Sequence, residues 1–369
     1  MTALSVTRER RADALTRACR GAPSALALFE IVSEQLRELV PFDGSAWFAT
    51  DPATLLGTSA VRVENIEPGH CETYWQRECL VEDALLFRDV ARSSQGVATL
   101  YETTNDRPAD SARYREYLAP QGYGDELRAA FRLGTTTWGV LDLYRDRSRA
   151  PFTKGDRDQI QRIAPAVAHA LRAFATAERR PAPAGGPGTA LFDRPGTLLS
   201  LDAQAELLFE EIGGPEWRAF PATMTPVHGV IARATAVVQG RDRGPAATRL
   251  RAASGRWLVL HASCLRGPDD ASGPTAVTVE PARSEQIAPI IVAAYALTPR
   301  EQQVTRAVAR GLSSQEIAVE LFLSPHTVRD YLKTIFSKVG VSSRGELVAN
   351  LFAEHYQHPL HESADQVEW

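Results

Sequence analysis

Charged and hydroxyl side chains gather on one face of a short segment near the end of the chain. The segment LSPHTVRDYLKTIFSKVGV, residues 323–341, contains two of the three lysines in the sequence, Lys333 and Lys338. A Ser-Pro pair at its start and a glycine at its end predict a helix over about residues 325–338. Apolar residues three and four positions apart predict that one side of this helix is buried. The outward, charged side is most often simply solvated, but it can also bind a nucleic-acid groove.

The neighbouring sequence predicts three more short helices, which would position this face. Patterns of the form S/T-x-x-E start at Thr298, Ser313 and Ser343, and each is typical of a helix N-terminus. The four predicted helices cover residues 299–310, 314–321, 325–338 and 344–354. Only three residues join the second helix to the third. A short helix, a tight turn and a longer helix with outward cations form the helix-turn-helix arrangement that reads DNA.

The same segment resembles the LuxR-type helix-turn-helix family from Leu297 to Arg344. The resemblance is carried by the stretches LTPRE, EIA, TV and GV, together with single landmarks at the spacing of the family: Gly311, Leu321, Ser324, Lys338 and Arg344. It implies that base edges are faced by Arg329, Asp330 and Lys333, and that the phosphate backbone is touched by Thr327, Lys338 and Arg344. It also implies that the last helix pairs two subunits through Leu347, Leu351 and Phe352, as a homodimer on double-stranded DNA. RNA polymerase is a further partner expected of such a protein.

Asp330 is an unusual residue for a surface that approaches phosphates, which repel a carboxylate. Two interpretations are open. The carboxylate could accept a hydrogen bond from a cytosine amino group, or it could orient the neighbouring Arg329.

The first 177 residues have the pattern of an α+β sandwich. Amphipathic helical segments, the strand-like stretch GSAWFAT, two strands around Gly134 that read as a hairpin, and a long final helix follow one another. The end of this section is similar to a GAF domain, which implies sensing of a small molecule or a partner protein. Candidate ligand-binding side chains are Trp47, Tyr74, Trp75 and Asp83, although core packing is the commoner role of such aromatic residues.

The remaining sections are predicted from composition and from short strand patterns. A Pro/Gly-rich linker is followed by a small α+β module that is faintly similar to a PAS fold. The predicted organisation is a multidomain α+β chain with a GAF-like α/β sandwich at 1–177, a linker at 178–188, a PAS-like module at 189–283, a connecting helix at 284–296, an all-α four-helix LuxR-type domain at 297–356 and an acidic tail at 357–369.

Composition limits the function classes that remain. The net charge of −4 excludes a broadly basic protein that coats nucleic acid, so any DNA contact must come from a local patch. The four scattered cysteines, the lack of a signal peptide and the shortness of every apolar run predict a cytoplasmic protein away from the membrane. No phosphate-binding loop, nucleophile elbow or metalloprotease motif is present in the sequence, so we expect neither an enzyme nor a cofactor or metal.

These patterns together predict a sequence-specific DNA-binding transcriptional regulator with an N-terminal sensor. Two alternatives from other classes stay open: a signalling enzyme whose first domain turns over its ligand, and a scaffold whose first domain binds another protein. The sequence leaves the effector, the operator and the direction of regulation undetermined.

Overall fold

The computed structural model describes residues 3–352, apart from 68–70, 177–184, 194–195, 220–223, 253, 269–271, 284–285, 288–289, 291–292 and 296. Two compact units divide the chain, Met1–Pro281 and Ala282–Trp369. Within the described residues, no helix has both the length and the apolar character needed to cross a membrane. The linker predicted at 178–188 and the connecting helix predicted at 284–296 lie in large part outside the described residues, and the tail at 357–369 lies wholly outside them.

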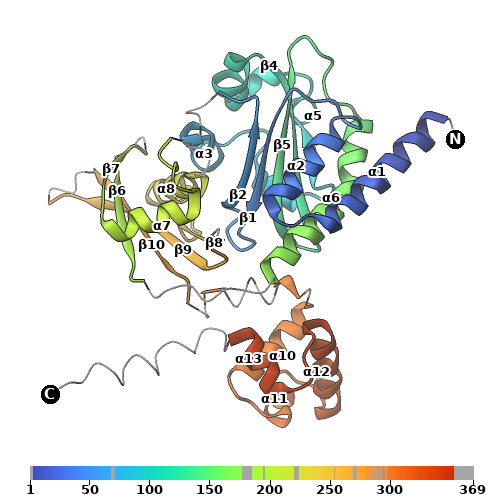
Figure 1. Cartoon of the computed structure of the whole chain (residues 1–369), viewed down its shortest axis with the longest axis vertical. Coiled ribbons are helices and arrows are strands. Elements are labelled where there is room, and N and C mark those ends of the chain that lie inside the picture. The colour runs from blue at the N-terminus through green and yellow to red at the C-terminus, as the bar shows by residue number, and fades with distance from the viewer. Residues whose placement is uncertain are drawn as a thin grey trace. The chain divides into compact units, whose positions relative to one another are not determined.

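The first sheet of the N-terminal unit is antiparallel, with the strand order β2-β1-β5-β4-β3 (Figure 1). Its strands are β1 (Gly44–Thr50), β2 (Gly57–Glu64), β3 (Val97–Thr99), β4 (Tyr123–Leu133) and β5 (Thr136–Asp146). One face is covered by α1 (Ala3–Gly21), α2 (Ala25–Leu36) and α6 (Lys154–Thr176). Shorter helices accompany the other face: α3 (Cys71–Leu80), α4 (Phe87–Arg92), α5 (Leu100–Thr103), η1 (Pro108–Asp110), η2 (Tyr114–Leu118) and η3 (Ala119–Gln121). The predicted α+β sandwich is present.

Two local features of the sequence help to position these elements. Strands β4 and β5 form the predicted hairpin, and Gly134 in its turn has a φ of +61°, which a residue with a side chain adopts only at a cost. Helix α6 begins with a capping box, because the backbone of Asp156 donates to Thr153 Oγ1 at 3.2 Å and the backbone of Thr153 donates to the Asp156 carboxylate at 2.8 Å.

A second antiparallel sheet completes the N-terminal unit, in the order β7-β6-β10-β9-β8. It contains β6 (Gly188–Phe192), β7 (Leu198–Leu201), β8 (Ala247–Arg251), β9 (Trp257–Arg266) and β10 (Ser272–Pro281), with helices α7 (Ala203–Gly213) and α8 (Thr225–Val238). In both sheets the strands lie in the order second, first, fifth, fourth, third along the chain. The two sheets therefore share a topology that the sequence pattern alone does not reveal.

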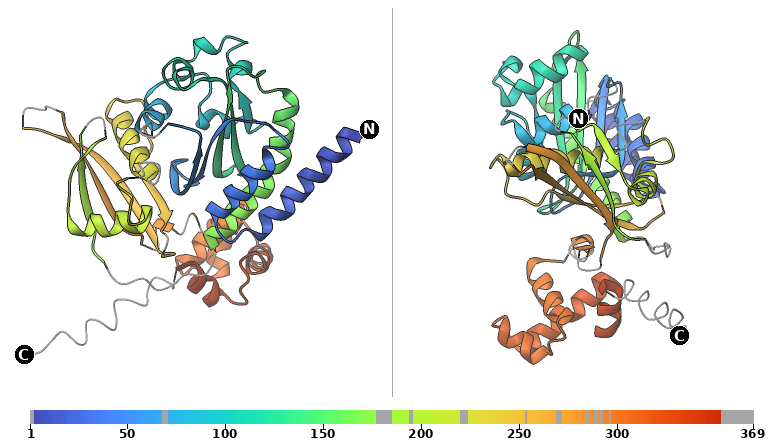
Figure 2. Two further views of the ribbon diagram at one scale, coloured as in Figure 1. Left: turned by 45° about the horizontal axis from the view of Figure 1, so that its top comes forward. Right: turned by 90° about the vertical axis from the view of Figure 1, so that its left-hand side faces the viewer.

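Helices α3 and α8 join the two sheets through one continuous apolar core (Figure 2). Trp75 of α3 packs so closely against Gly57 of β2 that a Cβ at Gly57 would lie 3.0 Å from its ring and 2.8 Å from Thr225 of α8. Beside this contact, the Asp51 carboxylate receives two hydrogen bonds of 2.8 Å from the Arg249 guanidinium. The sections predicted as GAF-like and PAS-like thus fold together as one unit.

The C-terminal unit contains α10 (Pro299–Ala309), α11 (Ser314–Glu320), α12 (Pro325–Val339) and α13 (Arg344–Phe352) around a core of its own. The capping boxes predicted at Thr298 and Ser313 are both complete. At Ser343 only half of the box forms, because the Glu346 carboxylate accepts from the backbone of Ser342 and not from that of Ser343. Helices α10, α11 and α12 begin and end within one residue of their predicted bounds, and α13 begins at its predicted residue.

Candidate nucleic-acid interface and a buried charge cluster

Helix α12 presents the charged face that the sequence indicated. Its N-cap Ser324 accepts a hydrogen bond from the backbone of Thr327, and its apolar stripe is buried in the core of the C-terminal unit. Arg329 and Lys333, which lie about one turn apart, are both exposed on the other side. Arg329 makes one hydrogen bond to its own helix, from Nε to the carbonyl of Pro325 at 3.3 Å. Most of its guanidinium remains available for an external acceptor.

Asp330 is paired with a residue that the sequence analysis did not single out. His326 Nδ1 lies 3.0 Å from the Asp330 carboxylate, four residues along the same helix, and both side chains are largely exposed. The interpretation that Asp330 orients Arg329 is therefore not the arrangement observed. The histidine sits in the first turn of the helix, where residues of a DNA-reading helix contact base edges, so its position was the clue available in the sequence.

Two cations expected at the phosphate backbone are engaged inside the domain. Lys338 Nζ lies 2.7 Å and 2.9 Å from the two oxygens of Glu301, whose side chain is only 5% exposed. Burial alone would raise the pKa of Glu301, but hydrogen bonds from Lys338 and Thr298 more than offset it and hold this pKa below its usual value. Arg344 donates to the carbonyl of Leu312. The pairing of Lys338 with Glu301 inside the domain favours a structural role for this lysine.

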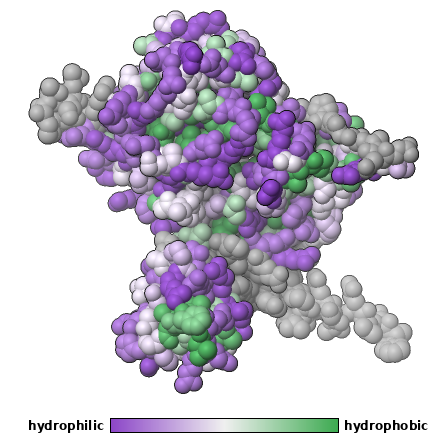
Figure 3. Space-filling view, turned by 180° about the vertical axis from the view of Figure 1, so that it is seen from behind, coloured by the Kyte–Doolittle hydropathy of each residue, from purple (hydrophilic) through white to green (hydrophobic). Residues whose placement is uncertain are grey.

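Of the three residues of α13 expected at a dimer contact, the structure describes the side chain of Leu347. Leu347 is fully buried in the core of its own unit, so it cannot contact a second subunit. The side chains of Leu351 and Phe352 lie outside the described residues. Among the described residues of this unit, the large apolar side chains that are exposed are Val319 (77%) and Phe322 (95%). In Figure 3 apolar surface is gathered on the C-terminal unit.

The four sensor candidates do not form one site. Trp47 stacks against Phe29 and Phe131 on the face of the sheet that α2 covers. Tyr74 and Trp75 lie on the opposite face, where Phe48 contacts both rings. Asp83 is half-buried and accepts a hydrogen bond of 2.7 Å from the backbone of Arg113. Trp47 is therefore separated by the sheet from Tyr74 and Trp75, because successive residues of a strand point to opposite faces.

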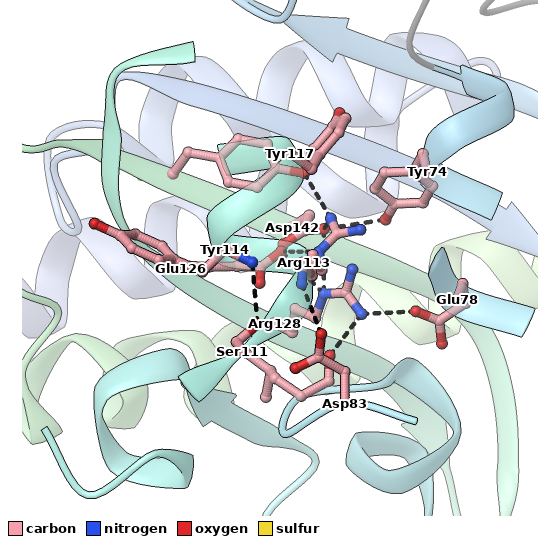
Figure 4. Close-up of polar contacts among 12 residues, drawn as sticks. Tyr74, Glu78, Asp83, Ser111, Arg113, Tyr114, Tyr117, Glu126, Arg128 and Asp142 are labelled. Carbon is pink, nitrogen blue, oxygen red and sulfur yellow. Dashed lines mark hydrogen bonds and ion pairs between the residues drawn. The ribbon is translucent and has the colours of Figure 1, made fainter. Parts of the chain in front are cut away.

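A buried cluster of charges lies on the face of the first sheet that carries Tyr74 (Figure 4). Two fully buried arginines, Arg113 and Arg128, form its centre. Arg113 Nε donates to Glu126 at 2.8 Å and its Nη2 donates to Asp142 at 2.9 Å. Arg128 lies 3.2 Å and 3.3 Å from the same two carboxylate oxygens.

Helix α3 contributes two further side chains to the cluster. Tyr74 donates its hydroxyl to Asp142 at 3.0 Å, and its ring lies 4.5 Å from the Arg113 guanidinium carbon. One turn further along α3, Glu78 accepts from Arg128 at 2.7 Å. Figure 4 shows the two guanidinium groups on the same side of the sheet, next to Tyr74 and Glu78.

Four atoms of this cluster are buried without a hydrogen-bond partner among the described residues: Arg113 Nη1, Arg128 Nη2, Glu126 Oε2 and Asp142 Oδ1. Buried polar atoms of this kind are costly and rare in proteins. Burial raises the pKa of Glu126 to about 7, with Asp142 adding to the rise and the two arginines opposing it.

Comparison with known protein families identifies one domain in the N-terminal part of the chain and another in the C-terminal part. Residues 295–351 match the bacterial regulatory proteins, luxR family. Residues 24–171 match the GAF domain. The C-terminal unit thus contains a LuxR-type helix-turn-helix domain, and the first sheet with its helices is a GAF domain.

Three curated relatives match this chain over short segments, which are less than a third of the length of each relative. A putative HTH-type transcriptional regulator of Mycobacterium bovis is 48% identical over 52 residues, which are 14% of this chain and 6% of that protein. The probable HTH-type transcriptional regulator GfsR of Streptomyces halstedii is 49% identical over 51 residues, which are 14% of this chain and 21% of that protein. The transcriptional regulatory protein UhpA of Escherichia coli is 45% identical over 56 residues, 15% of this chain and 29% of that protein.

Among solved structures, that of Escherichia coli SdiA is 13% identical, with 93% of this chain and 95% of that chain covered and a TM-score of 0.32. This value is too low to support an argument about the fold.

The cluster residues of the GAF domain escaped the sequence analysis, although the strands contained a clue. Glu126 and Arg128 alternate on β4 within the otherwise apolar stretch ELRAAF, and Asp142 interrupts the apolar stretch of β5. Arg128 and Asp142 are direct cross-strand partners in the hairpin. Charges at alternate positions of two paired, buried strands predict a buried ionic cluster, once the register of the hairpin is known.

Proposed function

We propose that this protein is a DNA-binding transcriptional regulator in which α12 enters the major groove of double-stranded DNA. The proposal rests on the exposed Arg329 and Lys333 of α12, which is the second helix of the helix-turn-helix pair in a LuxR-type domain. Regulators similar to this segment support it, but they share only the segment with this chain. The activity of the whole chain is therefore inferred from one domain.

Within α12 we assign the reading of bases to Arg329 and Lys333. The planar fork of an arginine matches the O6 and N7 acceptors of guanine, and such a pair discriminates between bases by about 1–3 kcal/mol. Asp330 reads a base only if it leaves His326, because their side chains are paired in the free protein. Thr327 stays our candidate for a phosphate contact, since its hydroxyl lies at the exposed start of the helix, 2.9 Å from that of Ser324.

We further propose that the GAF domain supplies the sensor, which responds to a small molecule or a partner protein. The section around the second sheet is proposed to be PAS-like, on the basis of its five antiparallel strands and two helices. In this proposal the protein acts in the cytoplasm as a homodimer on DNA, in contact with RNA polymerase. The dimer contact would then involve surfaces other than Leu347, which is buried.

The test is selection of DNA from a pool of random sequences by the full chain. We expect a defined motif for the wild type and for an Arg306→Ala control, which removes an exposed arginine of α10. The Arg329→Ala variant should lose preference at one base pair of that motif. A motif that is unchanged in Arg329→Ala would show that Arg329 is not a base-reading residue. Failure of the wild type to enrich any sequence would overturn the proposed function.

A further inference from the structure

The charge cluster of the GAF domain contains more negative than positive groups. Three carboxylates, Glu78, Glu126 and Asp142, face two guanidinium groups, those of Arg113 and Arg128. All five side chains are at least nine-tenths buried. One uncompensated negative charge in such a place is costly, because the surroundings cannot solvate it as water does.

The hydrogen bonds indicate that the excess negative charge lies on two of the three carboxylates. Both oxygens of Glu78 accept hydrogen bonds, one from the backbone of Phe87 at 2.7 Å and one from Arg128 at 2.7 Å. Glu126 and Asp142 instead each use a single oxygen for both arginines. Their second oxygens, Glu126 Oε2 and Asp142 Oδ1, have no donor among the described residues. These two carboxylate oxygens therefore require a donor.

A proton fits this requirement better than a larger cation. Glu126 lies opposite Tyr144 in the hairpin and Arg128 lies opposite Asp142, so Glu126 and Asp142 are diagonal neighbours on one face of the sheet. A metal ion would need several oxygen or nitrogen ligands, and the described residues contain no group of three or more side chains able to hold one. A proton taken from solvent needs no cavity, and it converts one carboxylate into a donor for the other.

We propose that Glu126 is a proton-binding site beside Asp142, in which the Glu126 carboxyl group is protonated near neutral pH and its proton is released as the pH rises. The other titratable groups that face the pair are Tyr74 and Glu78 from α3, Tyr117 from η2 and Tyr144 from β5, with Asp83 and Asp125 at its edge.

Loss of this proton would change the contacts that helix α3 makes with the cluster. Tyr74 bonds to Asp142 and Glu78 bonds to Arg128, while Trp75 of the same helix packs beside Gly229 of α8 in the core that joins the two sheets. Protonation of Glu126 is thus a candidate signal for the sensor role proposed above. The regulatory meaning rests on that proposed function, whereas the proton site itself can be tested without DNA.

The expected pH dependence of folding follows from the direction of the pKa shift. Burial and the neighbouring Asp142 raise the pKa of Glu126 above the value of an unfolded chain, so the folded protein binds the extra proton. The stability that this proton contributes is complete below the unfolded pKa and is lost as the pH rises through the folded pKa. Between these values the unfolding constant should increase by about tenfold for each pH unit.

The experiment measures urea unfolding of the full chain between about pH 5 and pH 8, together with the infrared band of a protonated carboxyl group. Glu126→Gln, which mimics the protonated form, should remove most of the pH dependence and the band. The control Asp158→Asn, at an exposed carboxylate of α6, should change neither.

An infrared spectrum of the wild type without a titrating protonated band would overturn the proposal, even if the Glu126→Gln variant failed to fold. An unchanged pH dependence in a folded Glu126→Gln variant would overturn it as well. Neither result would affect DNA binding by the C-terminal unit, so failure of the proton site and failure of the proposed function are distinguishable.

Discussion

Replacement of Lys338 by alanine should destabilise the C-terminal unit, because it leaves the carboxylate of Glu301 buried without its cation. Removal of one partner of a fully buried ion pair costs about 3–5 kcal/mol. The Glu301 side chain is 5% exposed, but that of Lys338 is 33% exposed, so water can reach the vacated position. The backbone of Thr298 also continues to donate to Glu301 at 2.6 Å. With this screening we expect a loss of about 1–3 kcal/mol.

The assay is hydrogen exchange at the backbone amides of α10 and α12 in the full chain, which reports the stability of this unit separately. The matched control is Lys333→Ala, because Lys333 is exposed on the same helix and should change stability by less than about 0.5 kcal/mol. The double variant Glu301→Gln/Lys338→Met should recover part of the loss, since no buried charge then remains and the glutamine oxygen can still accept from Thr298.

The alternative role for Lys338 gives a different result. A lysine bound to a DNA phosphate contributes about one unit to the dependence of log affinity on log salt concentration. Our account expects Lys338→Ala to leave that slope unchanged at temperatures where the domain is folded. A slope reduced by about one unit, with unchanged hydrogen exchange, would refute the structural role.

Three further predictions concern stability. Ser313→Ala removes the N-cap of α11 and should cost about 1 kcal/mol in the same hydrogen-exchange assay, whereas Ser337→Ala on the exposed side of α12 should cost little. Arg249→Met leaves the buried Asp51 without its guanidinium partner, and it should lower the urea midpoint of the N-terminal unit by the equivalent of about 2–4 kcal/mol. The control is Arg243→Met, at an exposed arginine, which should leave the midpoint unchanged. An unchanged midpoint in Arg249→Met would contradict the contact. Gly57→Ala should also lower the urea midpoint of the N-terminal unit, because the new methyl group would lie 2.8 Å from Thr225 and 3.0 Å from Trp75. A stability equal to that of the wild type would show that β2 and α8 are not in contact.

The C-terminal helices were predictable because their start and stop signals are local. Ser313 and Glu316 satisfy each other three residues apart, and Gly340 ends α12 with a φ of +77°, so neither feature depends on the rest of the fold. The hairpin of β4 and β5 was predictable for the same reason. Its turn is a short stretch around Gly134.

The functional assignments of single side chains were less predictable, because their partners are distant in the chain. Glu301 and Lys338 are 37 residues apart, and Asp51 and Arg249 are 198 residues apart. The sequence shows each of these four as a charged residue, but the pairing depends on the fold, which brings distant parts of the chain together. The side of the sheet on which Trp47 lies was hard to predict for a related reason, since its strand is buried on both faces and shows no alternation of apolar and polar residues.

The most direct test of the central claim is genome-wide mapping of the DNA bound by the full-length protein in cells, beside an Arg329→Ala/Lys333→Ala variant. Our account predicts discrete bound sites that share a sequence motif for the wild type, and the loss of those sites in the variant at equal protein abundance. Bound sites without a common motif, or sites retained in full by the variant, would contradict the claim that α12 reads DNA.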